Sequence, residues 1–289
     1  MQFGKLAIIG PGLLGGSMAL ALRERGLARE FALYGRRPES LAGAEAHGMR
    51  DYCSTDLPKV AAGAEFCVLA TPVGAMAALL EAAMPHLAAQ AVITDVGSVK
   101  GQLVYDLEAI CLKHNAATGR NAQFVGSHPM AGSEQTGFQA ARADLFVGAT
   151  CFVTPTEKTR AEARQLVQLF WRELGASVAS VSPDQHDPIV ARISHVPHLM
   201  ASLLVNLTTE SEMEYCGGGF RDTTRIASGS PGMWTEILLE NGAAVEKTLG
   251  DLIRDLEEAR RLIASGDAAA LHQVLERAKE ARDRLPARK

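Results

Sequence analysis

Short apolar runs alternate with longer amphipathic stretches over the first part of the chain. The runs have strand length and end in glycine, proline or other turn residues, and the stretches between them have helical spacing. The predicted strands are KLAII, FALY, EFCVLATP, AVITDVGS, QFVGSHP, ATCFVTP and ASVASVSP, and the predicted helices include 75–89, 101–114 and 157–174. Strands that alternate with helices are typical of a parallel sheet covered by helices, so the pattern predicts an α/β fold for this part.

From Asp184 onward the strand pattern ends and helical periodicity takes over. Apolar residues recur there at steps of three and four, at Val245, Leu249, Leu252, Ile253, Leu256, Leu262 and Ile263 and again at Leu271, Val274, Leu275 and Ala278. Asp267 follows Gly266 and is expected to cap the last helix. We therefore expect two domains, an α/β domain over residues 1–183 and an all-helical domain over 184–289. With few residues for a core of its own, the helical domain is expected to interlock with a second copy.

The first predicted strand runs directly into a glycine motif. Gly10, Gly12 and Gly15 have the spacing G-x-G-x-x-G, with Leu13 and Leu14 between the last two, and a predicted helix follows. In such motifs the first glycine permits a tight turn, the second lets the backbone approach a pyrophosphate, and the third lets the helix pack on the strand. The helix N-terminus then offers unpaired N–H groups to phosphates. The motif predicts that the first domain binds a dinucleotide.

The end of the second predicted strand bears on the choice between NAD and NADP. An NAD-binding protein normally carries an acidic residue about twenty positions after the glycines, where it holds the ribose 2′-OH. Here Gly35 stands at that distance and is followed by Arg36 and Arg37. Two guanidinium groups could pair with a 2′-phosphate, so NADP is favoured as the cofactor and NAD is the alternative. The other interpretation is a pair of solvated arginines at the start of a helix.

Three polar residues fall at the carboxyl ends of predicted strands, where an open parallel sheet binds its ligand. They are Thr71, Ser98 and His128, and we expect them to face one cleft, with Thr71 and the following Pro72 touching the cofactor. His128 lies in the stretch SHPMAGSEQTG, a poor sequence for a helix or a strand. We therefore expect it on an irregular turn, where catalytic groups are common.

Composition narrows the remaining classes of function. The 289 residues are 47% hydrophobic with a formal charge of −4, and the basic residues form no extended run, so a small molecule is a better partner than a nucleic acid. Five scattered cysteines without a CxxC pair argue against disulfides and thiolate metal sites and favour the reducing cytoplasm. The apolar stretch 6–22 is shorter than the ~20 residues of a membrane span and is broken by glycines, so no membrane association is expected.

Two motifs in the helical domain carry candidate ligand-binding residues. In ISHVPH, Ser194 and His198 are four residues apart and would share one face of a helix that Pro197 kinks. No carboxylate or cysteine stands near the two histidines of this motif at matching spacing, so no metal is expected. Further on, Arg225 could hold a carboxylate through its two guanidinium nitrogens, and Trp234 could either line a pocket or belong to the core.

Taken together, the motifs resemble those of the prephenate/arogenate dehydrogenase family. GPGLLGGS, DVGSVK, HPMAGSE, SHVPH and RDTTRIASGSPGMW occur in that order and span nearly the whole chain. The resemblance implies an N-terminal Rossmann-like dinucleotide-binding domain followed by an all-α C-terminal dimerisation domain, and a homodimer. The chain ends after the predicted helical part, so we expect no fused regulatory or mutase domain.

The resemblance also implies functions for individual residues. It makes His128 the catalytic histidine, which accepts the proton of the substrate 4-hydroxyl, and Ser98 its hydrogen-bonding neighbour near the nicotinamide. Arg225 would take a substrate carboxylate. The other residues implied around the substrate or the domain interface are Ser133, Glu134, Ser194, His198 and Trp234. The implied reaction is the NAD(P)-dependent oxidative decarboxylation of prephenate to 4-hydroxyphenylpyruvate in tyrosine biosynthesis.

Other functions remain open at this point. An arogenate dehydrogenase would make tyrosine directly, and Glu134 could favour the ammonium group of arogenate. A β-hydroxyacid dehydrogenase or imine reductase of similar build would rely on a lysine in the helical domain, for which Lys247 is the candidate. A nucleotide-sensing protein without catalytic activity is a further class, and an assay of NADPH formation with prephenate and arogenate separates all of these.

Overall fold

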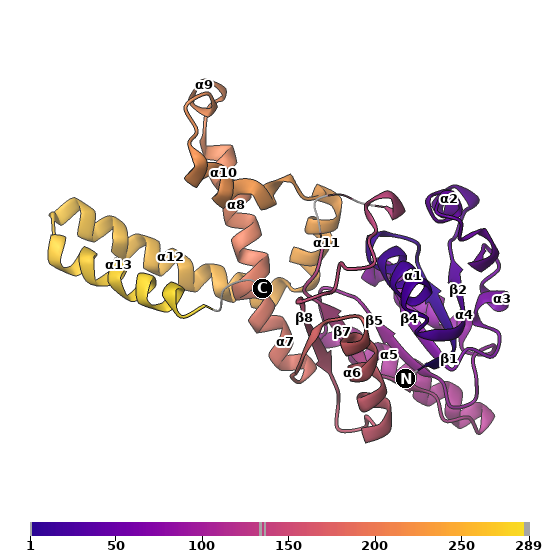
Figure 1. Ribbon diagram of the computed structural model, residues 1–289. Coiled ribbons are helices and arrows are strands. Elements are labelled where there is room, and N and C mark those ends of the chain that lie inside the picture. The colour runs from indigo at the N-terminus through magenta and orange to yellow at the C-terminus, as the bar shows by residue number, and fades with distance from the viewer. Residues whose placement is uncertain (1, 133–134, 136, 286–289) are drawn as a thin grey trace.

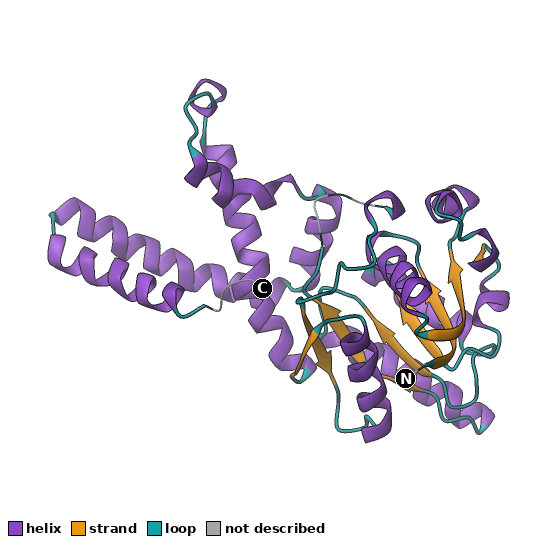
Figure 2. Cartoon of the chain, in the orientation of Figure 1, coloured by secondary structure: helices purple, strands orange, loops and turns teal. Residues whose placement is uncertain are grey.

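The computed structural model describes residues 2–132, 135 and 137–285. Within these residues the first part of the chain contains a six-stranded parallel sheet in the order β3-β2-β1-β4-β5-β6 (Figures 1 and 2). Its strands are β1 (Phe3–Ile9), β2 (Ala28–Tyr34), β3 (Cys53–Ser54), β4 (Phe66–Leu69), β5 (Val92–Asp95) and β6 (Gln123–Phe124). This is the strand order of a dinucleotide-binding fold, with the switch point between β1 and β4. The α/β prediction is confirmed.

Helices cover both faces of this sheet. They are α1 (Leu13–Arg25), α2 (Pro38–Ala46), α3 (Leu57–Ala61), α4 (Val73–Ala83), α5 (Gly101–Thr118) and α6 (Ala161–Glu173). Because side chains alternate along a strand, β1 sends Leu6 and Ile8 into one core and Ala7 and Ile9 into the other. The first core includes α1 and α6, and the second includes α4 and α5. The central strand is thus buried on both faces, which explains its unbroken apolar sequence.

A second sheet contains β7 (Gly126–Pro129), β8 (Thr150–Thr154) and β9 (Ser177–Ser180). The sequence predicted one strand over QFVGSHP, but the structure divides it at Val125 into β6 of the first sheet and β7 of the second. Gly126 permits this crossing, since a Cβ there would lie 2.4 Å from Thr154 Oγ1 and 2.6 Å from Val104 Cγ2.

The prediction of an irregular turn at His128 is therefore wrong. His128 belongs to β7 and pairs with Phe152 of β8 in antiparallel register. The residue before a proline is sterically driven to extended geometry, and Pro129 follows His128. The X-Pro dipeptide was thus a signal for strand rather than turn.

Several element boundaries also differ from those predicted. The helix predicted at 75–89 begins and ends earlier, as α4, whereas α5 extends beyond 101–114 to Thr118. The short edge strand β3 was not predicted at all, because two residues carry no readable period.

The rest of the chain is helical in its described residues. Its elements are α7 (Pro183–Val190), η3 (Ala191–His195), α8 (Val196–Leu207), α9 (Glu210–Met213), α10 (Gly218–Thr224), η4 (Arg225–Ser228), α11 (Pro231–Glu240), α12 (Gly242–Ser265) and α13 (Ala268–Asp283). Asp267 caps α13 as predicted, because its side chain accepts a hydrogen bond of 3.0 Å from the amide of Ala270. Figure 1 shows α12 and α13 as a hairpin that projects away from the sheets.

The helices α7 and α8 are joined by η3, a five-residue segment of π-helix. Pro197 stands just after this segment, and a proline cannot donate the i→i−4 hydrogen bond of an α-helix. The expected kink is thus a π-helical turn. Ser194 lies inside this turn, and His198 lies just beyond it in the first turn of α8.

Residues Pro183–Leu207 form a helix that is long and apolar enough to cross a membrane by length and composition alone. The same helix carries His186, Asp187 and His195 in hydrogen bonds with other elements of the protein. We interpret it as the central helix of the helical part.

Candidate active site

The glycine motif forms the turn between β1 and α1. Gly10 has a φ of 120°, and a Cβ there would lie 2.3 Å from the carbonyl oxygen of Ala70. A Cβ on Gly15 would lie 1.9 Å from the carbonyl oxygen of Gly10, whereas one on Gly12 would meet no atom within 4 Å. Gly10 and Gly15 are therefore required by the fold itself. Gly12 leaves open space at the N-terminus of α1, as the approach of a pyrophosphate requires.

Other groups at this edge also fit a dinucleotide. A cavity of about 270 Å³ adjoins the turn, lined by Pro11, Gly12, Glu39, Ser40, Gly43, Gly137, Phe138 and Gln139. Thr71 is half-buried next to Gly10, and its hydroxyl has no hydrogen-bond partner in the described part of the chain. Pro72 is exposed at the start of α4, and Leu13 and Leu14 pack against the core beneath α1.

The residues after β2 include one that the sequence analysis missed. Arg36 and Arg37 are exposed at the carboxyl end of β2, and the hydroxyl of Ser40 donates a 2.6 Å hydrogen bond to the Arg37 carbonyl. Glu39 lines the same cavity as Gly12, on the first turn of α2. An acidic residue, absent at position 35, is thus present at Glu39, four residues later.

His128 is buried on β7, with 7% of its surface exposed. Its Nδ1 lies 2.9 Å from Nε2 of His186 on α7, and Nδ1 of His186 lies 2.7 Å from Oδ1 of Asp187. Phe152 presents its ring perpendicular to that of His186, at 5.3 Å between centroids. His128 was predicted from the sequence, whereas His186 and Asp187 were not, because they stand far along the chain in DQHDP.

Asp187 is fixed by the start of α5. Its carboxylate accepts hydrogen bonds from the amides of Lys100, at 2.7 Å, and Gly101, at 2.9 Å. Amides at a helix N-terminus have no partner within the helix and favour negative charge. The carboxylate of Asp187 therefore joins the helical part to the sheet part, next to His186, the hydrogen-bond partner of His128.

The pKa values of this group are shifted in a consistent direction. Burial, together with the charges of His186, Lys100 and His195, holds the pKa of His128 well below its usual range. Burial also lowers the pKa of His186, although its hydrogen bond to Asp187 opposes the shift. For Asp187, burial raises the pKa, but the hydrogen bonds from His186, Lys100 and Gly101 outweigh it, so the pKa is lowered. Both imidazoles are therefore neutral and the carboxylate is charged near neutral pH.

A buried ion pair lies beside β7, the strand that carries His128. Lys100 and Asp95 are both fully buried and hydrogen-bonded to each other, and Lys100 Nζ also donates to the Val99 carbonyl at 2.9 Å. Asp95 in turn accepts from the amide of Ser127, next to His128, at 3.0 Å. Ser98, which the sequence singled out from this DVGSVK motif, is half-buried in the loop between β5 and α5. The motif thus also supplies a buried pair that the sequence analysis did not recognise.

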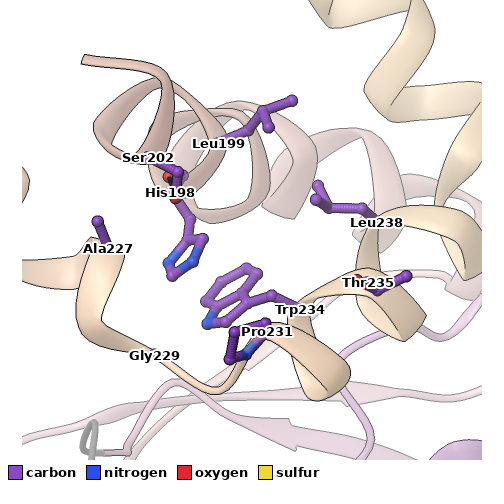
Figure 3. Close-up of a pocket in the computed structure, with 9 residues that line it drawn as sticks. All are labelled: His198, Leu199, Ser202, Ala227, Gly229, Pro231, Trp234, Thr235 and Leu238. Carbon is purple, nitrogen blue, oxygen red and sulfur yellow. Dashed lines mark hydrogen bonds between the residues drawn. The ribbon is translucent and has the colours of Figure 1, made fainter. Parts of the chain in front are cut away.

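His198 and Trp234 form the wall of a second cavity, of about 260 Å³, between α8 and α11 (Figure 3). Their rings are stacked, with centroids 3.5 Å apart and planes 13° apart. Nδ1 of His198 is buried and lacks a hydrogen-bond partner among the described residues. Gly229 lies so close that a Cβ would be 2.5 Å from Trp234 Nε1. Trp234 therefore lines a cavity, one of the two interpretations left open above.

His195 lies between the hydrogen-bonded group of His128, His186 and Asp187 and the cavity lined by Trp234. It is 1% exposed, and its Nδ1 accepts a hydrogen bond of 3.0 Å from Nδ2 of Asn241, which also donates to the carbonyl of Asp187 at 2.9 Å. Its ring stands at 81° to that of Trp234. Burial, more than any neighbouring charge, lowers the pKa of His195 to about 4. Its neighbours Ser194 and His198 in SHVPH were predicted from the sequence, but His195 itself was not.

The remaining predicted residues of the helical part lie on η4, η3 and α12. Arg225 is exposed on η4, Ser194 is half-buried in η3, and Lys247 is exposed on α12. Ser133 and Glu134 lie outside the described residues. Within residues 2–132, 135 and 137–285, no three histidine, cysteine, aspartate or glutamate side chains are grouped as a metal site.

Comparison with known proteins identifies the family. Residues 18–180 match the family model of the prephenate dehydrogenase nucleotide-binding domain, and residues 182–277 match that of the prephenate dehydrogenase dimerization domain. The chain belongs to the prephenate dehydrogenase family. It is 34% identical to a prephenate dehydrogenase of Bacillus subtilis, over 98% of this chain and 76% of the relative.

Solved members of the family share the whole architecture. The chain is similar to the prephenate dehydrogenase of Aquifex aeolicus in complex with hydroxyphenyl propionate and NAD+, with a TM-score of 0.88 and 35% identity over 98% of both chains. It is also similar to the arogenate dehydrogenase of Synechocystis, with a TM-score of 0.78 and 30% identity over 96% of this chain and 99% of the other. The family assignment made from the motifs is confirmed.

Proposed function

We propose that this protein is a prephenate dehydrogenase, which converts prephenate to 4-hydroxyphenylpyruvate and CO2 with reduction of a nicotinamide dinucleotide. The observation that carries the proposal is a buried, neutral His128 in a domain whose glycine turn is shaped for a dinucleotide. Family membership and the similarity to a prephenate dehydrogenase over nearly the whole chain support it.

The dinucleotide would be held at the turn after β1. Gly12 supplies the open backbone at the start of α1, and the unpartnered hydroxyl of Thr71 is available beside it. When bound, the nicotinamide supplies the acceptor for a hydride. Positioning by the protein accounts for much of such a rate enhancement, because it holds donor and acceptor in line.

His128 accepts the proton of the substrate 4-hydroxyl. Prephenate carries this hydroxyl opposite a quaternary carbon that bears a carboxylate. As the O–H bond breaks and the C–H bond at the same carbon releases a hydride, the bond to the carboxylate breaks at the opposite end, CO2 leaves and the ring becomes aromatic. The proton on His128 then returns to the ring oxygen, which gives the hydroxyl of 4-hydroxyphenylpyruvate. A neutral imidazole is ready for this step, and such general-base catalysis typically contributes ~10²–10⁴-fold. Ser98, in the loop after β5, is proposed as the hydrogen-bonding neighbour of His128.

Substrate carboxylates need cationic or polar partners. We assign one carboxylate to Arg225, and the side chain of the substrate to the region of the His198–Trp234 cavity. Ser194 is proposed nearby, and Ser133 and Glu134 remain in the proposal from the family motif alone. The similarity to an arogenate dehydrogenase supports arogenate as the alternative substrate.

For the cofactor, we propose NADP, with Arg36 and Arg37 paired to its 2′-phosphate. Glu39 favours the alternative, NAD, because its carboxylate borders the cavity beside Gly12 and could accept from a ribose 2′-OH. The relative from Aquifex aeolicus was solved with NAD+. A comparison of kcat/KM for the two cofactors tests the proposal, and a clear NAD preference would refute it.

We further propose a dinucleotide-binding domain over residues 1–183, a helical domain over 184–289 and a homodimer that forms through the helical domain. Among the described residues of the helical part, the buried apolar cluster is small and contains Ala191, Val196 and Val245, with Val190, Ala201, Ile237 and Leu262 also buried. Large apolar side chains on these helices are exposed, among them Leu207, Leu239, Ile253, Leu256, Ile263 and Leu275. A second copy would cover such a surface, as the family name of the domain indicates. All five cysteines are free, which fits a cytoplasmic protein.

The decisive assay is NADPH or NADH formation with prephenate and, in parallel, with arogenate. We expect activity with prephenate, and the ratio of the two kcat/KM values ranks the substrates.

His128→Asn should lower kcat by a factor on the order of 10² or more with nearly unchanged cofactor binding. Arg225→Gln should mainly raise KM, since a carboxylate contact is present in ground and transition states alike. Near-normal turnover of His128→Asn would remove this histidine from the mechanism.

A further inference from the structure

Three side chains from two parts of the fold form one hydrogen-bonded row. His128 on β7 meets His186 on α7, and His186 meets Asp187, whose carboxylate is held by two backbone amides of the start of α5. His186 is fully buried and His128 nearly so. A buried row of this kind has to match each donor with an acceptor, because an unmatched polar group is costly away from water.

The donors and acceptors can be assigned from the Asp187 end. An ionised carboxylate only accepts hydrogen bonds, and Asp187 already accepts from two amides at the start of α5. Nδ1 of His186 must therefore carry a proton and donate it to Asp187. A neutral imidazole has one N–H, so Nε2 of His186 is an acceptor, and Nδ1 of His128 must donate to it.

It follows that Nε2 of His128 carries no proton. This is the nitrogen of His128 that faces away from His186, and it presents a lone pair. A lone pair is what a group needs to take a proton from a hydroxyl. The opposite tautomer would present an N–H and could not act as the base.

We propose that His186 and Asp187 are positioning residues for the reaction, because they hold His128 in the tautomer whose Nε2 can accept the substrate proton. This inference rests on the proposed function of His128. When the hydroxyl O–H bond breaks and the Nε2–H bond forms, His128 becomes an imidazolium ion. Its Nδ1–H then points at His186, behind which stands the negative charge of Asp187.

The other charges around the row show why that carboxylate is needed. Lys100, at the start of α5, faces the histidines with a positive charge, and only part of this is offset by its partner Asp95 on β5. His195, on η3, is a further titratable neighbour. The thiol of Cys151, on β8, contacts the backbone of His128, and burial raises its pKa, so it is uncharged. Without Asp187 the new imidazolium would face an ammonium group through a medium of low dielectric constant, where like charges repel strongly. Asp187 supplies the opposite charge from the far side of the row.

The tautomers can be observed directly by NMR on the resting enzyme. Histidine labelled with ¹⁵N gives different Nδ1 and Nε2 shifts for each tautomer and for imidazolium, and loss of signals in His128→Asn and His186→Leu assigns them. We expect both rings to be neutral with the proton on Nδ1. A proton on Nε2 of His128, or a doubly protonated His186 at neutral pH, would overturn the proposal, and neither result depends on activity.

Kinetics of two His186 variants provide the second test. His186→Gln keeps a side-chain oxygen that can accept from His128, whereas His186→Leu has no acceptor. We expect His186→Leu to lose about 10²-fold or more in kcat with less than about threefold change in KM and cofactor affinity, and His186→Gln to recover much of that loss. His114→Leu, at a half-buried histidine elsewhere on α5, is the matched control and should retain kcat.

The outcomes separate this inference from the proposed function. If His128→Asn is inactive but His186→Leu and His186→Gln both turn over normally, the positioning proposal fails and the function stands. If both His186 variants lose activity equally, while the circular dichroism spectrum and cofactor binding are unchanged, the hydrogen bond that His186 accepts from His128 is not its contribution to the reaction, and the positioning proposal fails. Loss of prephenate turnover in all forms, the wild type included, refutes the function, and the NMR result still decides the tautomer.

Discussion

The buried histidine His195 should make folding stability depend on pH in a way that one substitution removes. The pKa of His195 is about 4 in the folded protein, against 6.5 as its ordinary value. Below pH 6.5 the unfolded chain binds a proton that the folded protein does not, so stability is lost as the pH falls from 6.5 toward 4. Protonation would also place an N–H against the Asn241 amide that donates to Nδ1.

The size of the effect follows from the pKa difference. A difference of this size corresponds to roughly 3 kcal/mol over the full range, and to about 2 kcal/mol between pH 7 and pH 5. The lowered pKa values of His128 and His186 act in the same direction, so the wild type should lose more than His195 alone accounts for. Asp187 titrates at lower pH, outside this window.

The assay is urea denaturation of the wild type and of His195→Gln at pH 7 and pH 5, at one fixed protein concentration because an oligomer couples stability to concentration. Glutamine can still accept from Asn241 but does not titrate in this range. We expect the free energy of unfolding to fall between the two pH values by about 2 kcal/mol less in the variant than in the wild type. Equal falls in the two proteins would refute the assignment of a buried, neutral His195, whatever the absolute stability of the variant.

Two further predictions concern glycines whose surroundings differ. A methyl group at Gly12 has open space, so Gly12→Ala should fold with unchanged Tm but bind the dinucleotide at least about tenfold more weakly, whereas Gly15→Ala meets the Gly10 carbonyl and should lower Tm as well. Cofactor titration and thermal melts check both variants. Normal cofactor affinity in Gly12→Ala would contradict a pyrophosphate at this turn. Gly229→Ala places a methyl group against Trp234 and should raise the KM for prephenate with little change in cofactor affinity; an unchanged KM would place the substrate side chain elsewhere.

The sequence could reveal those parts of the site that are encoded locally. Gly10, Gly12 and Gly15 were recognised because a strand, a tight turn and a helix N-terminus follow one another within a few residues. The alternation of apolar runs and helical stretches predicted the α/β part, and the change of period after Asp184 predicted the helical part. The cap at Asp267 was predicted for the same reason, since its partner is three residues away.

Contacts between distant segments decided the rest. His128 and His186 are 58 residues apart, and only the packing of α7 against the sheet part brings them to 2.9 Å. Lys100 looked like an ordinary charged residue after DVGSV, but the fold buries it against Asp95. Glu39 stood four residues from the expected position, and the orientation of α2 turns it toward the glycine turn.

The sequence by itself determined the fold class, the family and the dinucleotide turn, because local periodicity and residue spacing carry them. The tertiary structure alone decided which groups surround His128 and how they are charged. Burial and hydrogen bonding set those charges, and both depend on which elements pack together rather than on the order of residues along the chain.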